Sequence, residues 1–257
     1  MQAREIILPG PVSAIAAEGE GPPLVLLHGI GSSGRGFAPA LPFLPRRRIL
    51  APDMPGYGGS APLAAEFPAP DDFADWLAAV LDSAGIGRAD LLGHSLGGVM
   101  VAAFARRHPH RLGRIVLSAP ARGYAVADRQ EWPPGAWKRL RDFEAMGAEA
   151  YAAARAPRLV HRQEAAEAVR AEMARLTRAG LAASTALLAR GDTIGWLAAH
   201  PPVAVITGDE DAIVPPDASR ALAAHLGSRF VLLPGAGHAP YAEDPEAWGR
   251  AVSAALP

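Results

Sequence analysis

The stretch Gly93-His94-Ser95-Leu96-Gly97 decides the fold of this chain. It fits the pattern Gly-x-Ser-x-Gly, and the apolar run 91–93 leads into it while an apolar segment with helical spacing follows it. This context predicts a sharp, strained turn from a buried strand into a helix, with small residues on either side of the serine. The turn would raise the Ser95 hydroxyl above the sheet, over a helix N-terminus that stabilises developing negative charge. The alternative is an ordinary helix start with Ser95 as N-cap.

Strands and helices are predicted to alternate on both sides of this motif. Short apolar runs predict buried strands at 24–27, 49–51, 91–93 and 115–117, and longer segments predict helices at 71–83 and 95–107. Such alternation is typical of a parallel sheet that is covered by helices on both faces. Near the N-terminus, residues 6–8 and 12–17 flank Pro9-Gly10-Pro11 and predict an antiparallel hairpin at the sheet edge.

The alternation stops after Pro120 and resumes near residue 201. Between these points no strand is predicted, and the segment is rich in Ala, Arg and Glu and carries Trp132, Trp137 and Trp196. Strands at 203–207 and 230–233, a helix from about 217 and a final helix follow. We expect a core of residues 1–120 and 201–257, with residues 121–200 as a helical cap above the carboxyl ends of the strands, where open α/β sheets bind ligands. A helical layer with no part in binding is the alternative.

Two later loops add an acid and a histidine in a fixed order. Asp211 follows the strand that ends at Thr207, and His238 follows the strand that ends at Leu233. With Ser95 before them, they make the chain similar to the α/β-hydrolase superfamily over nearly its whole length. The resemblance implies the α/β-hydrolase fold: a mostly parallel, eight-stranded twisted sheet with helices on both faces and a helical cap. It also implies Ser95, Asp211 and His238 as catalytic residues.

Other acids and histidines are weaker candidates for these roles. Asp209 lies in the same loop, but the family pattern of Gly, two residues, Asp and then Pro matches Asp211, so Asp209 is expected to shape the turn. Some relatives carry the acid before the insert, where this chain has Ser118-Ala119-Pro120. His94 is expected to point away from the site. The remaining histidines that could compete look like surface or helix-end residues: His108, His110, His161 and His225.

Two glycine-rich loops extend the resemblance. His28-Gly29-Ile30-Gly31-Ser32 matches the family's His-Gly loop, which implies that the backbone N–H groups of Ile30 and Leu96 form the oxyanion hole. Asp53-Met-Pro-Gly-Tyr-Gly-Gly-Ser60 matches a second family loop, in which Asp53 and Ser60 are expected to hold a tight turn. That loop has neither a Walker lysine nor Gly-x-Gly-x-x-Gly spacing, so phosphate binding is not predicted.

The predicted activity is hydrolysis of a carboxylic ester or lactone through an acyl-enzyme, as in small carboxylesterases and 3-oxoadipate enol-lactonases, which the chain resembles. Haloalkane dehalogenases and epoxide hydrolases use Asp where this chain has Ser95, which disfavours both reactions. The alternatives are a carbon–carbon hydrolase of the meta-cleavage-product type, a cofactor-free perhydrolase or haloperoxidase, and a non-enzymatic receptor. Carbon–carbon hydrolases usually carry a Trp or another large residue at the position of Ala239 and a Gly-Pro-Gly stretch near Ile30, so these two departures favour esters or lactones.

The cap is expected to line the acyl pocket with its aromatic residues and with leucines such as Leu181, Leu187 and Leu188, but for each single residue a core position is favoured over substrate contact. Arg122 is a candidate partner for a substrate carboxylate, but a solvated arginine is the favoured interpretation. The acyl chain length, the oligomeric state and any movement of the cap stay open at this stage.

Composition limits the possible partners. The 257 residues carry a net charge of −1, and their basic residues form no stripe, so nucleic acid is not expected. The chain has no Cys, which excludes disulfides and cysteine nucleophiles, and no Asp or His at zinc-ligand spacing. We therefore predict neither a metal nor a cofactor. No signal-peptide core precedes Pro9, and no apolar run approaches the roughly 20 residues that span a bilayer, so a cytoplasmic protein without membrane contact is expected.

Overall fold

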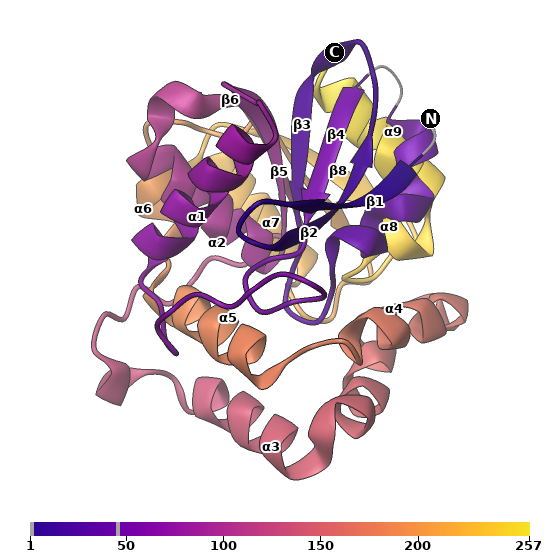
Figure 1. Ribbon diagram of the computed structural model, residues 1–257. Coiled ribbons are helices and arrows are strands. Elements are labelled where there is room, and N and C mark those ends of the chain that lie inside the picture. Colours follow the sequence, from indigo (N-terminus) through magenta and orange to yellow (C-terminus); the bar gives the residue numbers. More distant parts are fainter. Residues whose placement is uncertain (1–2, 45–46) are drawn as a thin grey trace.

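An eight-stranded sheet forms the centre of the computed structural model, which describes residues 3–44 and 47–257 (Figure 1). The strand order is β1-β2-β4-β3-β5-β6-β7-β8. The strands are β1 (Ala3–Leu8), β2 (Val12–Ala17), β3 (Gly21–Leu27), β4 (Arg47–Pro52), β5 (Ala89–His94), β6 (Leu112–Ser118), β7 (Ala204–Gly208) and β8 (Arg229–Leu233). β2 is antiparallel to β1 and to β4, and every other neighbouring pair is parallel. The predicted edge hairpin and mostly parallel sheet are confirmed.

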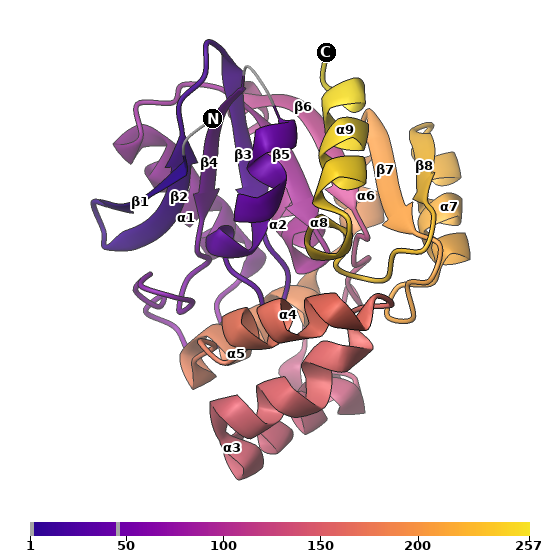
Figure 2. The ribbon, with the colours of Figure 1, turned by 90° about the vertical axis from the view of Figure 1, so that its right-hand side faces the viewer.

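Helices cover both faces of the sheet (Figures 1 and 2). One face carries α1 (Pro70–Ser83), α2 (Leu96–Arg107), α6 (Thr193–Leu197) and α7 (Pro216–His225). The other carries η1 (Gly34–Phe43), α8 (Pro240–Glu243) and α9 (Pro245–Ala255). Short 3-10 helices lie in the connections: η2 (Pro109–Arg111), η3 (Arg129–Glu131), η4 (Ala156–Arg158) and η5 (Gln163–Ala165).

Alternation along the central strands explains why both faces are covered. In β3, Val25 and Leu27 pack into the core on the α2 side, whereas Leu24 and Leu26 pack into the core on the α9 side. Successive side chains of a strand point to opposite faces, so a continuous apolar run needs helices on both. The short apolar runs of the sequence are therefore central strands of a parallel sheet.

A separate layer of helices crosses the carboxyl ends of the strands (Figures 1 and 2). It consists of α3 (Pro134–Arg155), α4 (Ala166–Met173) and α5 (Arg178–Arg190). Residues 121–200 contain no strand, as predicted. However, α6 lies within this segment and packs against α2, where the Arg106 guanidinium is 5.0 Å from the Trp196 ring centroid. The domain boundaries at residues 120 and 200 stay a prediction.

Helix α3 is bent sharply at Gly147 (Figure 1). The backbone there has φ 75° and ψ 166°, a conformation that is almost restricted to glycine. The bend divides the helix into two limbs, and both limbs contribute residues to the cavity described below. One glycine therefore shapes the part of the cap that faces the sheet.

We expect Gly147→Ala to lower the free energy of unfolding by about 1–3 kcal/mol, because alanine is strained at this φ and ψ. Gly135 in the same helix is the matched control: a methyl group there meets no atom within 4 Å, as at Gly147, but its φ is not positive. Gly135→Ala should therefore raise the same quantity by about 0.4–1 kcal/mol. Urea denaturation of both variants measures these changes. Equal effects of the two substitutions would contradict the role of backbone strain at the bend.

Candidate active site

Ser95 occupies the sharp turn between β5 and α2 that the sequence predicts. Its backbone has φ 51° and ψ −115°, and its N–H donates to the Ser118 carbonyl at 2.9 Å. A Cβ atom at Gly97 would lie 2.1 Å from the Leu27 carbonyl oxygen, so only glycine lets this turn approach β3. The strained turn is thus held between two neighbouring strands, with the serine side chain half-buried beneath the cap.

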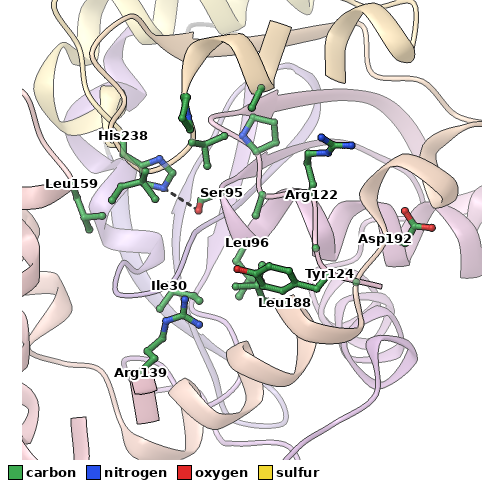
Figure 3. A pocket seen from close by; sticks show the side chains of 18 of the residues that line it. Ile30, Ser95, Leu96, Arg122, Tyr124, Arg139, Leu159, Leu188, Asp192 and His238 are labelled. Carbon is green, nitrogen blue, oxygen red and sulfur yellow. Dashed lines mark hydrogen bonds between the residues drawn. The ribbon is translucent and has the colours of Figure 1, made fainter. Parts of the chain in front are cut away.

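The structure brings Ser95, His238 and Asp211 together in one chain of hydrogen bonds (Figure 3). His238 Nε2 lies 3.0 Å from Ser95 Oγ, and His238 Nδ1 lies 2.9 Å from Asp211 Oδ2. Asp211 Oδ1 accepts from the N–H groups of Ile213 and Val214 at 2.8 and 2.9 Å. Because the carboxylate accepts from Nδ1–H, the lone pair on Nε2 faces the serine hydroxyl. The arrangement can remove a proton from Ser95.

Glu243 holds the loop that carries His238, and sequence reasoning missed it. Its buried carboxylate accepts from the N–H groups of Gly237, His161 and Arg162 at 2.9, 2.7 and 2.9 Å. One side chain therefore fixes the residue before His238 to the segment that follows α3. The only signal in the sequence is an acidic residue five positions after the histidine, which says nothing about its distant partners.

His28 fixes the glycine-rich loop beside Ser95. Its Nδ1 lies 2.8 Å from the Gly29 carbonyl, and its Nε2 accepts from the Met54 N–H at 2.9 Å. Only a neutral imidazole makes both hydrogen bonds, and burial lowers the pKa of His28. The loop presents Ile30 to the cavity opposite Leu96, and neither residue's N–H donates a hydrogen bond to another described residue.

The side chain of His94 points away from the cavity, as expected, but it packs against the site from behind. Its ring packs against His238 with the centroids 5.1 Å apart, and against Tyr241 at 4.9 Å. It does not line the cavity, because the alternation of β5 directs it to the α9 side of the sheet. Burial, followed by the nearby His238, lowers the pKa of His94 well below its ordinary value, so it is a neutral packing partner.

Two acidic residues have the structural roles expected from the sequence. Asp53 Oδ1 accepts from the Gly34 N–H at 2.8 Å, and Ser60 Oγ donates to the Asp53 carbonyl at 2.7 Å. Asp209 accepts from the Gly235 N–H at 2.6 Å and so shapes the loop rather than meeting His238.

A cavity of about 570 Å³ lies above Ser95 and below the cap (Figure 3). Its walls are mostly apolar and include Ile30, Leu159, Met173 and Leu188. This volume is within the usual range for small-molecule sites. The cavity therefore offers a ligand direct access to the Ser95 hydroxyl.

Only some of the cap residues named from the sequence line the cavity. Leu188 lines the cavity, but Leu181 and Leu187 are fully buried in the core. Trp132 and Trp137 stack on each other at 5.4 Å, away from the cavity, and the aromatic residues that do line it are Tyr124 and Tyr151. Phe67 packs edge-on against both tryptophan rings, an arrangement that aromatic pairs favour, so these rings form a cluster of their own.

Comparison with known protein families agrees with the fold and with the geometry of the site. The model of the alpha/beta hydrolase fold matches residues 22–245. The chain belongs to this family. The fold and the resemblance expected from the motifs are thereby confirmed, and so is the prediction that the chain is a hydrolase.

Individual relatives of this hydrolase include esterases. It is 31% identical to a pimeloyl-[acyl-carrier protein] methyl ester esterase of Aromatoleum aromaticum, over 88% of this chain and 94% of that protein. It is 40% identical to a 2-hydroxymuconate semialdehyde hydrolase of Pseudomonas sp., but over only 46% of this chain and 43% of that protein. A thermophilic esterase from Thermogutta terrifontis, solved with malate bound, superposes with a TM-score of 0.83 at 27% identity, covering 100% of this chain and 98% of that one.

Across the part of the chain that the structure describes, no helix combines the length and apolar character needed to cross a membrane.

We expect the free energy of unfolding of this hydrolase to fall below about pH 6.5, because burial lowers the pKa values of two histidines. The folded-state pKa values of His28 and His94 are lowered, whereas in the unfolded chain each histidine titrates near 6.5. Below that pH the unfolded state binds more protons, so the free energy of unfolding drops by up to about 1.4 kcal/mol per pH unit for each histidine. The full contribution is present above the unfolded pKa.

Urea denaturation between about pH 8 and pH 5.5 measures this slope. In His94→Gln the free energy of unfolding should change less steeply with pH, by up to about 1.4 kcal/mol per pH unit, which corresponds to one proton. A free energy of unfolding that stays constant across this range in the wild type would contradict the burial of two neutral histidines.

Proposed function

We propose that this hydrolase cleaves a carboxylic ester or lactone by nucleophilic catalysis, with Ser95, His238 and Asp211 as its catalytic residues. The observation that carries the proposal is the pair of hydrogen bonds through His238, at 3.0 Å to Ser95 Oγ and 2.9 Å to Asp211. A nucleophile, a base and a group that orients the base are the components that acyl transfer requires. All three lie at the wall of one ligand-sized cavity or directly behind it.

In the proposed mechanism, His238 Nε2 takes the hydroxyl proton while Ser95 Oγ attacks the carbonyl carbon. The carbonyl oxygen becomes an oxyanion and accepts hydrogen bonds from the N–H groups of Ile30 and Leu96, each worth roughly 3 kcal/mol in comparable sites. The tetrahedral intermediate collapses, His238 returns the proton to the departing oxygen, and an acyl-enzyme remains. Water, deprotonated by His238, then releases the acid and restores Ser95. Asp211 keeps the imidazole oriented and stabilises its protonated form.

Ester or lactone hydrolysis is supported over carbon–carbon cleavage by two observations. The esterase of Aromatoleum aromaticum matches over most of the chain, whereas the 2-hydroxymuconate semialdehyde hydrolase matches over less than half of it. In addition, Ala239, the residue after His238, is small and 2% exposed, so it leaves no large side chain beside the base. We propose a small-molecule ester or lactone as the partner of this site, beneath a cap within residues 121–200.

We expect the wild type to hydrolyse p-nitrophenyl esters with a burst of p-nitrophenol, and Ser95→Ala to abolish both burst and turnover. Assays from the acetate to the octanoate would locate the acyl length at which kcat/KM declines and so size the cavity. Ser219→Ala, which removes a buried serine hydroxyl on α7, is the control and should keep full activity.

Activity that survives in Ser95→Ala would contradict the proposed nucleophile. A wild type that is inert on all of these esters but cleaves a ring-fission diene would contradict the ester assignment and favour the carbon–carbon hydrolase.

A further inference from the structure

The cavity above Ser95 is lined by more positively charged than negatively charged side chains. Arg122, Arg139 and Arg155 line it, and Asp192 is the one carboxylate among its lining residues. Asp192 already accepts from the Gly195 N–H at 2.9 Å, at the start of α6. Among the described residues, no carboxylate lies within ion-pair distance of any of these three arginines. The cavity is therefore suited to an anionic ligand.

Arg139 is the most unusual of the three arginines. Its Nη1 is buried and has no hydrogen-bond partner within the described chain. Burial, the largest cause, lowers the pKa of its guanidinium, which still stays protonated at neutral pH. A buried donor without a partner is costly, and a ligand that completes its hydrogen bonds would explain why the chain keeps it. By contrast, the Arg122 that the sequence suggested is exposed to solvent.

Tyr151 supplies a second unpartnered donor in the same cavity. Its side chain is 1% exposed, and its hydroxyl has no hydrogen-bond partner among the described residues. Burial raises the pKa of Tyr151, so the hydroxyl keeps its proton and can donate it in a hydrogen bond. The Arg155 guanidinium lies 5.1 Å from the centre of the Tyr151 ring and adds positive charge behind it.

The bend at Gly147 brings these residues to one place. In a straight helix the 12 positions from Arg139 to Tyr151 would separate them by about 18 Å along the axis. The bend lets both limbs of α3 face the same cavity, which Ile30 and Arg139 both line (Figure 3). Ile30 is also the residue whose N–H we place in the oxyanion hole. A ligand can therefore reach Ser95 and Arg139 at once.

We propose that Arg139 and Tyr151 form a carboxylate-binding subsite, so that the preferred substrate is a monoester of a dicarboxylic acid. Its ester carbonyl meets Ser95 while its free carboxylate, at the far end of the acyl chain, accepts hydrogen bonds from the guanidinium fork and the phenol. The planar fork matches a carboxylate in shape and charge. The apolar walls at Ile30, Met173 and Leu188 suit the methylene chain between the two ends. This inference rests on the proposed function.

The test compares methyl monoesters of dicarboxylic acids, from succinic to suberic, with matched esters whose far carboxylate is a primary amide. At the acyl chain length that reaches from Ser95 to Arg139, the wild type should prefer the ester with a free carboxylate over the ester with a primary amide by about 100-fold in kcat/KM. Arg139→Met should bring this ratio close to 1, mainly by lowering kcat/KM on the acid, and Arg139→Lys should keep part of the preference. Arg141→Met removes an exposed charge from the same helix and should leave the ratio unchanged.

Other arms of the test locate the carboxylate and separate the two proposals. The carboxylate could instead lie on the alcohol part of the ester. If Arg139→Met changes the acid preference only for such esters, the assignment to the acyl chain is wrong. If the enzyme hydrolyses p-nitrophenyl esters but cleaves the methyl esters with a far carboxylate and those with a far amide equally well, the subsite is wrong and the esterase proposal stands.

Binding can be tested without turnover. Free glutarate or adipate should raise the Tm of the wild type but not of Arg139→Met, and inorganic phosphate should protect less. Arg139→Met should itself have a higher Tm than the wild type, because it no longer buries an unpaired charge. If no dicarboxylate raises the Tm of the wild type and Arg139→Met is less stable, the charge has a structural role and the subsite is wrong.

Discussion

The hydrogen bond between His238 and Asp211 is the interaction on which the rest of the site depends. It joins two loops that leave different strands, and it determines which nitrogen of the imidazole faces Ser95. A rotated ring would lose both hydrogen bonds. For this reason the surrounding structure over-determines the position of each partner: two backbone N–H groups hold Asp211, and Glu243 fixes the residue before His238.

The parallel sheet makes this meeting possible. Strands β5, β7 and β8 run in the same direction, so the loops after their carboxyl ends gather at one edge, on the side of the sheet where α3, α4 and α5 lie (bottom of Figure 2). The sheet places Ser95, His238 and Asp211, whereas the helical layer covers the cavity beside them and supplies most of the charge within it. Glu243 connects the two parts, because its carboxylate binds backbone on both sides.

Local patterns predicted the elements whose causes are local. The apolar runs, the glycines around Ser95 and the order of the three loops were sufficient for the strands, the sheet and the residues that meet. They failed where the cause is a contact between distant segments. Neither Glu243 nor the packing of His94 has a signature in its own stretch of sequence. The sequence around Arg122 and Arg139 likewise gives no reason to choose between them. Only the structure shows that Arg139 has a buried nitrogen without a partner among the described residues, whereas Arg122 is exposed.

The role of the His238–Asp211 hydrogen bond is tested most directly by steady-state kinetics on a p-nitrophenyl ester with two variants of one loop, Asp211→Asn and Asp209→Asn. Asp211→Asn should lower kcat by about 10⁴-fold at unchanged fold, because the amide stabilises the wrong imidazole tautomer. Asp209→Asn should remain within a few-fold of the wild type, since among the described residues the one hydrogen bond to its side chain comes from the Gly235 N–H and none comes from His238. A large loss in Asp209→Asn with near-normal turnover in Asp211→Asn would contradict the proposed role of the His238–Asp211 bond.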